Sequence, residues 1–276
     1  MRLGNVDGAG ERAASAGPPR PDDAGGARDP DEDDAQAACR SRNDDAPQIA
    51  HASSEAVHGR VKIAFVGGTG PAGLGLGARL ARAGHDVAIG SRSEERARDA
   101  AAQVLALAGD GSVSADTNEK VIPAADVVVL SVRADAQPET VRALAGLLDG
   151  KIVLSMANPV TVAQGRASYE GPPEGSLAEQ AQHGAPRARV VSALHEIRVS
   201  RFAKLELAID SDTIVTGDDA GAKEAIMALC ADVGVRPVDG GPLSNSRYVE
   251  AFVAVLVSIN FRYKAGVSYR ITGLPS

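Results

Sequence analysis

The sequence predicts an α/β fold in which a doubly wound parallel sheet is followed by a small C-terminal portion containing a long buried helix. Short apolar runs alternate with helical patterns from Val61 onward, which is typical of βαβ units. Runs such as VVVLSV are apolar without a break, as in parallel strands that are buried on both faces. The last long pattern, Arg247–Lys264, is apolar around much of its circumference, which favours burial of that helix.

The expected elements follow one another in the order that such a sheet requires. Strands are predicted at Lys62–Val66, Val87–Ile89, Ser112–Ser114, Val127–Val132, Ile152–Ser155, Arg189–Ala193, Leu205–Ile209, Thr213–Val215 and Val235–Asp239. Helices are predicted at Ala72–Ala83, Glu94–Leu107, Asn118–Ala124, Pro138–Leu147, Leu177–Gln182, Ala220–Val233 and Arg247–Lys264. Because ligands of such sheets bind beyond the carboxyl ends of the strands, the residues that follow each strand are the first candidates for a site.

The turn after the first strand carries a dinucleotide-binding pattern, GxGxxG, in the form Gly68-Thr69-Gly70-Pro71-Ala72-Gly73. Gly68 permits the tight turn, Gly70 lets the backbone approach a pyrophosphate, and Gly73 lets the helix pack closely on the strand. The free N–H groups at the start of that helix then face the phosphates. We therefore expect a Rossmann-type dinucleotide site that uses all six residues of this turn.

The end of the second strand indicates which dinucleotide binds. An NAD site usually offers an acidic residue there for the ribose 2′-hydroxyl group. This chain offers Ser91 and Arg92, with Arg96 one helical turn further on. Because arginine binds phosphate through paired, charge-assisted hydrogen bonds, these residues suit a 2′-phosphate. The predicted cofactor is NADP(H).

Composition excludes several other classes of partner. The net charge of −7 favours neither a nucleic-acid groove nor an anionic membrane surface, which leaves small molecules as the expected partners. The longest apolar run, within Val249–Phe261, is too short to span a bilayer. Cys39 and Cys230 belong to no metal-binding cluster, so no metal site is predicted. Two unpaired thiols fit a reducing cytoplasm.

Residues 1–60 differ in kind from the rest of the chain. They hold 12 acidic and seven basic residues and almost no large apolar side chains. Such a segment buries too little apolar surface to offset its ordering entropy, so a disordered acidic extension is expected. The alternative is that the natural chain starts near Val57 or Val61. The remaining boundaries predict a dinucleotide-binding domain at 61–197 and a C-terminal portion at 198–276.

Three segments together resemble one family, the NADPH-dependent reductases of the deazaflavin coenzyme F420. They are GGTGPAG at Gly67–Gly73, VVSALHEIRVSRF at Val190–Phe202, and VDGGPLSNSRYVE at Val238–Glu250. The resemblance covers most of residues 61–265 in the same order. It implies reversible hydride transfer between NADPH and coenzyme F420, and a cytoplasmic homodimer whose C-terminal portion serves the deazaflavin pocket and dimerisation.

The resemblance also implies roles for individual residues. Thr69, Ser91, Arg92 and Arg96 fall where the family binds the phosphates of NADP. His195 and Ile197 fall where the family lines its deazaflavin pocket, and Leu243 falls in the segment beside it. His195 and Leu243 are expected to position the rings, with no catalytic side chain. Ser131, Val132 and Asn158, which follow the fourth and fifth strands, complete the predicted cofactor-binding set.

One loop departs from the family pattern. After the fourth strand the family tends to have proline and an aromatic residue, whereas this chain has SVRAD at 131–135. Arg133 in that loop is a candidate for the phosphate or the acidic tail of the coenzyme. A basic cluster of Arg198, Arg201 and Lys204 can meet the same tail, or it can simply form a solvated face.

Simpler interpretations stay open for several of these residues. His195 can be a strand-end histidine bonded to a carbonyl group, and Ser244, Asn245 and Ser246 can cap the last helix. Arg247 is expected to form an ion pair with Glu250 rather than bind an anion. Another NADP-dependent reductase of a ketone or imine would need a proton donor such as Lys204 or Tyr248. A redox sensor without enzymatic activity is the non-enzyme alternative.

Overall fold

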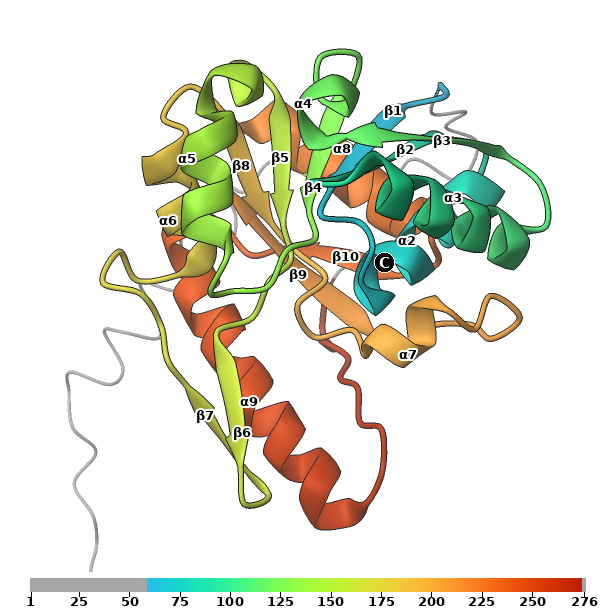
Figure 1. Ribbon diagram of the computed structural model, residues 1–276. Coiled ribbons are helices and arrows are strands. Elements are labelled where there is room, and N and C mark those ends of the chain that lie inside the picture. The colour runs from blue at the N-terminus through green and yellow to red at the C-terminus, as the bar shows by residue number, and fades with distance from the viewer. Residues whose placement is uncertain (1–58, 275–276) are drawn as a thin grey trace, which may run out of the picture. The chain divides into compact units, whose positions relative to one another are not determined.

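The structure is a computed structural model and describes residues 59–274 of the chain. The expected acidic extension therefore lies almost entirely outside the described residues. The main sheet has eight strands in the order β10-β9-β8-β5-β4-β1-β2-β3, with helices on both faces (Figure 1). Its strands are β1 (Lys62–Val66), β2 (Asp86–Ser91), β3 (Ser112–Thr117), β4 (Val127–Leu130), β5 (Ile152–Ser155), β8 (Arg189–Ser192), β9 (Asp212–Gly217) and β10 (Arg236–Asp239). The predicted Rossmann-type α/β fold is confirmed.

Helices form two layers because neighbouring residues of each strand point to opposite faces of the sheet. Ile63 and Phe65 of β1 pack in one core cluster, and Ala64 and Val66 pack in the other. The first layer contains α2 (Pro71–Arg82), α3 (Glu94–Ala108) and α8 (Ala220–Asp232). The second contains α4 (Asn118–Val121), α5 (Gln137–Leu148) and α6 (Leu177–Gly184). This is the doubly wound arrangement that the alternating pattern predicts.

The sheet is not parallel throughout, which corrects the prediction at one edge. β9 pairs antiparallel with β8 through Val191–Gly217 and Ser192–Thr216, and β10 is parallel to β9. The short helix α7 (Val199–Phe202) connects β8 to β9 and packs against α2. Because this connection stays near the carboxyl ends of the parallel strands, the chain enters β9 from that edge and runs back.

Two local predictions need correction. Residues 160–169 form a hairpin, β6 (Val160–Ala163) and β7 (Arg166–Tyr169), that the strand pattern does not predict. Its turn residues Gln164 and Gly165 have φ angles of 51° and 73°, as in the two-residue turns that favour hairpins. The strand predicted at 205–209 is absent. Arg79 donates hydrogen bonds to the backbone oxygens of Arg201, Phe202, Lys204 and Leu207, and the backbone N–H of Leu207 donates to the backbone oxygen of Lys204, which holds this segment as a turn against α2.

The last helix, α9 (Ser246–Tyr263), packs against the β6–β7 hairpin. Its expected burial holds for one side only. Val249, Glu250 and Val253 are buried, whereas Tyr248 is 70% exposed and Val255 is 51% exposed. None of the helices within residues 59–274 is both long and apolar enough to cross a membrane.

Glu250 fastens α9 to the start of α6. The two oxygens of its carboxyl group accept hydrogen bonds from the backbone N–H groups of Leu177 at 2.9 Å and Ala178 at 3.1 Å. The side chain is completely buried. Burial raises the pKa of Glu250 to about 7, and Glu179 adds to this rise, while the two backbone hydrogen bonds oppose it. Arg247, expected to bind Glu250, instead forms its ion pair with Glu179.

This raised pKa makes a contribution to stability that depends on pH. Because folded Glu250 keeps its proton up to about pH 7, its contribution is fully present below pH 4.5 and is lost as the pH rises through 7. The loss is on the order of 3 kcal/mol.

The variant Glu250→Gln tests this contribution. Its side chain cannot ionise, so its free energy of unfolding should fall less than that of the natural protein between pH 5 and 8. Urea unfolding at both pH values measures the difference. The exposed control Glu224→Gln should keep the natural pH dependence, and equal slopes for all three proteins would contradict the assignment.

Candidate functional site

The glycine turn is shaped for a ligand at the start of α2. A Cβ atom built at Gly73 lies 2.7 Å from the backbone oxygen of Gly68 and 2.8 Å from Ser131 Oγ, so only glycine lets helix and turn approach this closely. No side chain caps α2 at Gly70. Ser131 Oγ is buried and has no hydrogen-bond partner among the described residues. An uncapped helix start beside an unsatisfied hydroxyl fits the phosphates of a dinucleotide.

The basic side chains expected to choose NADP(H) come together after β2. Ser91 is buried, and its Oγ accepts a hydrogen bond from the backbone N–H of Ser93 at 3.3 Å. Ser93 caps α3 by accepting a bond from the backbone N–H of Arg96. The side chains of Arg92 and Arg96 are exposed at this strand–helix junction. Within residues 59–274 neither forms an ion pair, which leaves both guanidinium groups available to an anion.

A large cavity lies beyond the carboxyl ends of β4 and β5. Its volume is about 700 Å³, within the range of cofactor-sized ligands. It is lined by Val132, Arg133, Ala134, Asp135, Pro138, Ala157, Asn158, Pro159, Val160, Thr161, Glu170, Pro172, Leu177 and Gln180. Val132 and Asn158 of the predicted set therefore share one cavity, and Ser131 lies between it and the glycine turn. Arg133 forms a 2.9 Å ion pair with Asp135.

His195 joins the loops that follow β5 and β8. Its Nδ1 lies 3.1 Å from the backbone oxygen of Ala157 and 3.2 Å from Asn158 Oδ1, so Nδ1 carries the proton. Nε2 then accepts a hydrogen bond from Ser192 Oγ at 2.6 Å. Asn158 Nδ2 donates in return to the backbone oxygen of His195 at 2.9 Å. Burial lowers the pKa of His195 to about 4, so the ring is neutral and holds the two loops together.

The backbone is strained immediately before this histidine. Leu194 has a φ angle of 66°, in the left-handed region that leucine rarely adopts. Its backbone N–H donates to Thr213 Oγ1 at 2.8 Å. Strain of this kind persists only where the surroundings fix it, and it gathers at functional sites.

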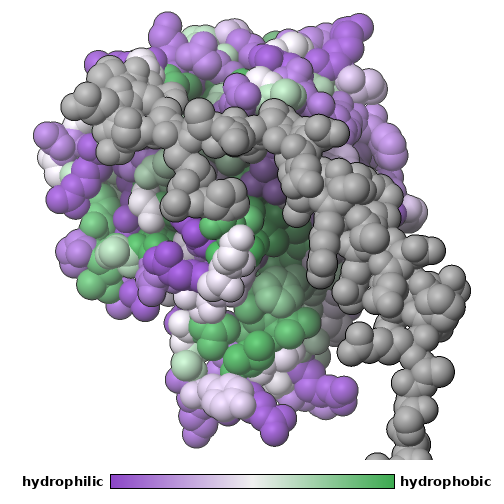
Figure 2. All heavy atoms as spheres, turned by 180° about the vertical axis from the view of Figure 1, so that it is seen from behind, coloured by the Kyte–Doolittle hydropathy of each residue, from purple (hydrophilic) through white to green (hydrophobic). Residues whose placement is uncertain are grey.

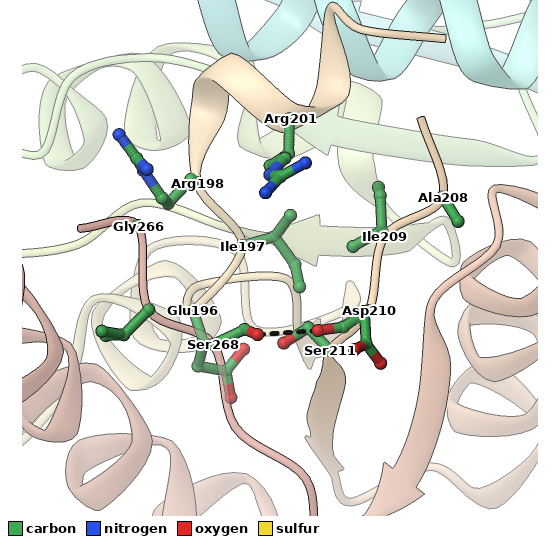
Figure 3. A pocket seen from close by; sticks show the side chains of 11 residues that line it. Glu196, Ile197, Arg198, Arg201, Ala208, Ile209, Asp210, Ser211, Gly266 and Ser268 are labelled. Atoms are coloured by element: carbon green, nitrogen blue, oxygen red, sulfur yellow. Dashed lines mark hydrogen bonds between the residues drawn. The ribbon is translucent and has the colours of Figure 1, made fainter. Parts of the chain in front are cut away.

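A small cavity of about 180 Å³ lies on the other side of the His195–Ile197 turn (Figure 3). It is lined by Glu196, Ile197, Arg198, Arg201, Ala208, Ile209, Asp210, Ser211, Gly266, Val267 and Ser268. Ile197 of the predicted set borders this cavity. The segment from Gly266 onward, which lies beyond the residues that the family resemblance covers, forms one wall.

Leu243 lies on the opposite side of the sheet from Ile197, in the cluster against which Val132 packs. This cluster is the one on the α5 and α6 side of the sheet, and Leu243 is buried in it. Leu243 lines neither cavity. The neighbouring polar residues do not cap α9 with their side chains. Asn245 donates to the backbone oxygen of Gly240 at 2.7 Å, and Ser246 Oγ lies 3.0 Å from Ser176 Oγ. These contacts hold the segment in the packed core, and the role of Leu243 beside the deazaflavin stays a prediction.

Two residues support the site without being predicted from the pattern. Asn118 is buried at the start of α4, and its Oδ1 accepts a hydrogen bond from the backbone N–H of Gly67 at 3.2 Å. Arg79 on α2 donates to the backbone oxygens of Arg201, Phe202, Lys204 and Leu207 at 2.7 to 3.0 Å. Both act on segments more than 50 residues away in sequence, and no local pattern marks such contacts.

Comparison with known proteins points in the same direction. A family model described as NADP oxidoreductase, coenzyme F420-dependent, matches residues 62–159. The F420-dependent NADP reductase of Methanocaldococcus jannaschii is 36% identical over 222 residues, which cover 78% of this chain and 99% of the relative. That of Methanothermobacter thermautotrophicus is 36% identical over 223 residues, covering 78% of this chain and 96% of the relative.

A solved structure extends the likeness to the fold. The crystal structure of an assigned F420-dependent NADP reductase from Arthrobacter sp. FB24 gives a TM-score of 0.66 at 27% identity. The match covers 77% of this chain and 100% of that chain. Sequence and fold thus agree over nearly the whole length of these relatives. The chain belongs to the family of F420-dependent NADP reductases.

Proposed function

We propose that this protein is a cytoplasmic enzyme that transfers a hydride reversibly between NADPH and coenzyme F420. The observation that carries this function is the junction of a dinucleotide-binding turn with a cavity at the carboxyl ends of β4 and β5. The family resemblance supplies the second substrate, since the curated relatives are F420-dependent. The buried free thiol of Cys230 agrees with a reducing compartment.

The chain's own residues bind and orient the nicotinamide nucleotide along the edge of the sheet. Arg92 and Arg96 hold the 2′-phosphate, and the turn from Gly68 to Gly73 holds the pyrophosphate. The nicotinamide end then extends past Ser131 and Val132 into the large cavity, toward Asn158. This order follows the strands β2, β1, β4 and β5 across the sheet.

The hydride chemistry itself belongs to the two bound cofactors, which exchange it directly between ring carbons. The protein holds these carbons about 3–3.5 Å apart and excludes water. The Asn158–His195 hydrogen bonds fix the two loops between which the rings lie. Because His195 is neutral and its proton faces Ala157 and Asn158, it is a positioning residue and not a proton donor.

The alternative chemistry of a ketone or imine reductase finds less support. Such a reaction needs a proton donor beside the substrate. Lys204 and Tyr248, the two candidates that the sequence offers, line neither the large nor the small cavity. Tyr169 donates its hydroxyl hydrogen to the backbone oxygen of Gly175 at 2.7 Å and so is already engaged. Hydride exchange between two cofactors requires no such donor.

An isotope experiment tests the function. NADPH that carries deuterium on one face of its reactive carbon is mixed with oxidised coenzyme F420 and the protein, and the reduced coenzyme is examined by mass spectrometry. Direct transfer predicts that one of the two labelled forms of NADPH delivers its deuterium and that the other delivers hydrogen. Hydrogen alone from both forms would exclude direct transfer.

We also propose that the protein is a homodimer formed through the exposed side of α9. Tyr248, Phe252, Val255 and Ile259 follow one another at spacings of four, three and four residues, so they form one stripe along the helix. Figure 2 shows apolar surface gathered in the lower part of the molecule, where α9 lies in Figure 1. A stripe of this kind suits a second helix, and a second copy of the chain supplies one. This role falls within the predicted C-terminal portion, 198–276.

Light scattering after size-exclusion chromatography tests the homodimer. The natural protein should have twice the mass of one chain, and the double variant Tyr248→Lys, Val255→Lys should have the mass of one. The control Leu105→Lys places a lysine at an exposed leucine on α3, outside the stripe, and should leave the dimer intact. A monomeric natural protein would contradict the proposal.

A further inference from the structure

The small cavity has one basic side and one side that carries oxygen atoms. Figure 3 shows Arg198 and Arg201 on one side of Ile197, while Glu196, Ser211 and Ser268 lie on the other. Its volume of about 180 Å³ is below the range of whole cofactors. It can therefore take a compact group of a larger ligand, and the charges decide which group.

The acidic side chains of this cavity already have partners. Glu196 accepts hydrogen bonds from Tyr269 Oη at 2.7 Å and Thr213 Oγ1 at 3.1 Å, and Asp210 forms an ion pair with Arg270. In the described part of the chain, no carboxylate forms an ion pair with Arg198 or Arg201. In this part of the chain the two unpaired arginines outnumber Glu196, the one lining carboxylate without a cationic partner, so the net charge at the cavity is positive, which favours an anion.

Both arginines sit on a segment that the fold holds in place. A Cβ atom built at Gly266 would lie 1.6 Å from Arg198 Nη1, so the Arg198 guanidinium lies directly against this glycine. The backbone that carries Arg201 is held by Arg79. This side chain donates hydrogen bonds to the backbone oxygens of Arg201, Phe202, Lys204 and Leu207. A segment held in this way presents its charges with little loss of entropy on binding.

The turn at His195–Ile197 separates this basic side from the large cavity. Its His195 end is hydrogen-bonded to Asn158 in the large cavity, and its Ile197 end lines the small one. A ligand whose ring system lies at this turn can therefore place an anionic chain over Arg198 and Arg201. Arg133, which lines the large cavity, is already paired with Asp135.

We propose that the small cavity binds the phosphate at the start of the acidic tail of coenzyme F420 through Arg198 and Arg201. These two residues then distinguish the coenzyme from its deazaflavin nucleoside, which has the same ring system and no charged tail. The proposal rests on the proposed function and names the part of the second substrate that the small cavity recognises. Of the two roles open to the basic cluster, the structure thus favours tail recognition by its two arginines.

Equilibrium binding tests this proposal without turnover. Fluorescence of the oxidised deazaflavin is titrated in the presence of saturating NADP+, where no hydride is available. The natural protein should bind coenzyme F420 about 10–100-fold more tightly than the nucleoside, since two arginine–anion contacts are added. Arg198→Gln combined with Arg201→Gln should remove most of this difference and leave the Kd of the nucleoside unchanged. Raising the salt concentration should weaken coenzyme binding to the natural protein only.

Two further variants make the test specific. Gly266→Ala displaces the flexible end of Arg198 and should weaken coenzyme binding in the same direction by a smaller factor. Arg133→Gln, which removes the paired arginine of the large cavity, should leave the preference intact. If the double variant keeps the full preference, or if Arg133→Gln abolishes it, the tail lies elsewhere. If the natural protein binds neither deazaflavin, the proposed function fails instead, and the two failures are distinct.

Discussion

Replacing Gly70 by valine is expected to raise the Kd for NADPH by about 100-fold or more while leaving the Tm of the protein unchanged. A Cβ atom built at Gly70 meets no other atom within 4 Å, and the φ and ψ angles of −86° and 164° suit valine. The protein therefore tolerates the larger side chain. The open space is that which the GxGxxG pattern leaves for the pyrophosphate, so the cofactor meets the valine. Calorimetric titration and thermal unfolding measure the two quantities.

A glycine further along the same helix provides the control. A Cβ atom at Gly77 has its nearest neighbours at 3.6 Å, an ordinary contact with the side chains of Val87, Ile89 and Val104. Gly77→Ala should therefore preserve both the fold and the affinity for NADPH. Natural affinity in the Gly70→Val protein would show that the pyrophosphate does not lie at this turn.

Arg92→Glu is expected to raise the KM for NADPH by about 100-fold with little change in the KM for NADH. The substitution removes a guanidinium that has no carboxylate partner among the described residues and places a negative charge where the 2′-phosphate is expected. NADH lacks this phosphate, so its binding should barely respond. Steady-state kinetics with both nucleotides measure the change in preference.

The matched variant makes the same change of charge on the neighbouring helix. Arg98→Glu alters an exposed residue of α3 whose partner is Glu94, and the preference for NADPH should persist. An equal shift in both variants would indicate a general effect of charge. An unchanged NADPH preference in Arg92→Glu would remove the 2′-phosphate from this position.

The dinucleotide part of the site can be predicted from the sequence because its chemistry is local. The glycine turn, the strand before it and the helix after it are contiguous, and the Ser91–Arg96 junction follows within one further element. Each needs only a backbone conformation or a charge at a fixed spacing. The order of the strands β1 to β5 follows from the same alternation of apolar strands and amphipathic helices.

The part of the site that meets the second substrate depends on contacts between distant segments. The small cavity joins residues 196–211 with residues 266–268, and Tyr269 reaches Glu196 across 73 positions of the chain. Arg79 reaches Leu207 across 128 positions. Contacts between residues this far apart in sequence leave no mark on the periodic pattern of a strand or a helix. For the same reason the sequence does not show that Leu243 is buried in the core cluster on the opposite side of the sheet from Ile197.

The most direct measurement of the central claim is an absorbance assay with the purified protein, oxidised coenzyme F420 and a nicotinamide nucleotide. Because reduction removes the visible absorbance of the deazaflavin, hydride transfer predicts rapid bleaching with NADPH and little bleaching with NADH. Absence of bleaching by NADPH, in a protein shown to bind NADPH, would contradict reduction of coenzyme F420 and leave only the dinucleotide site.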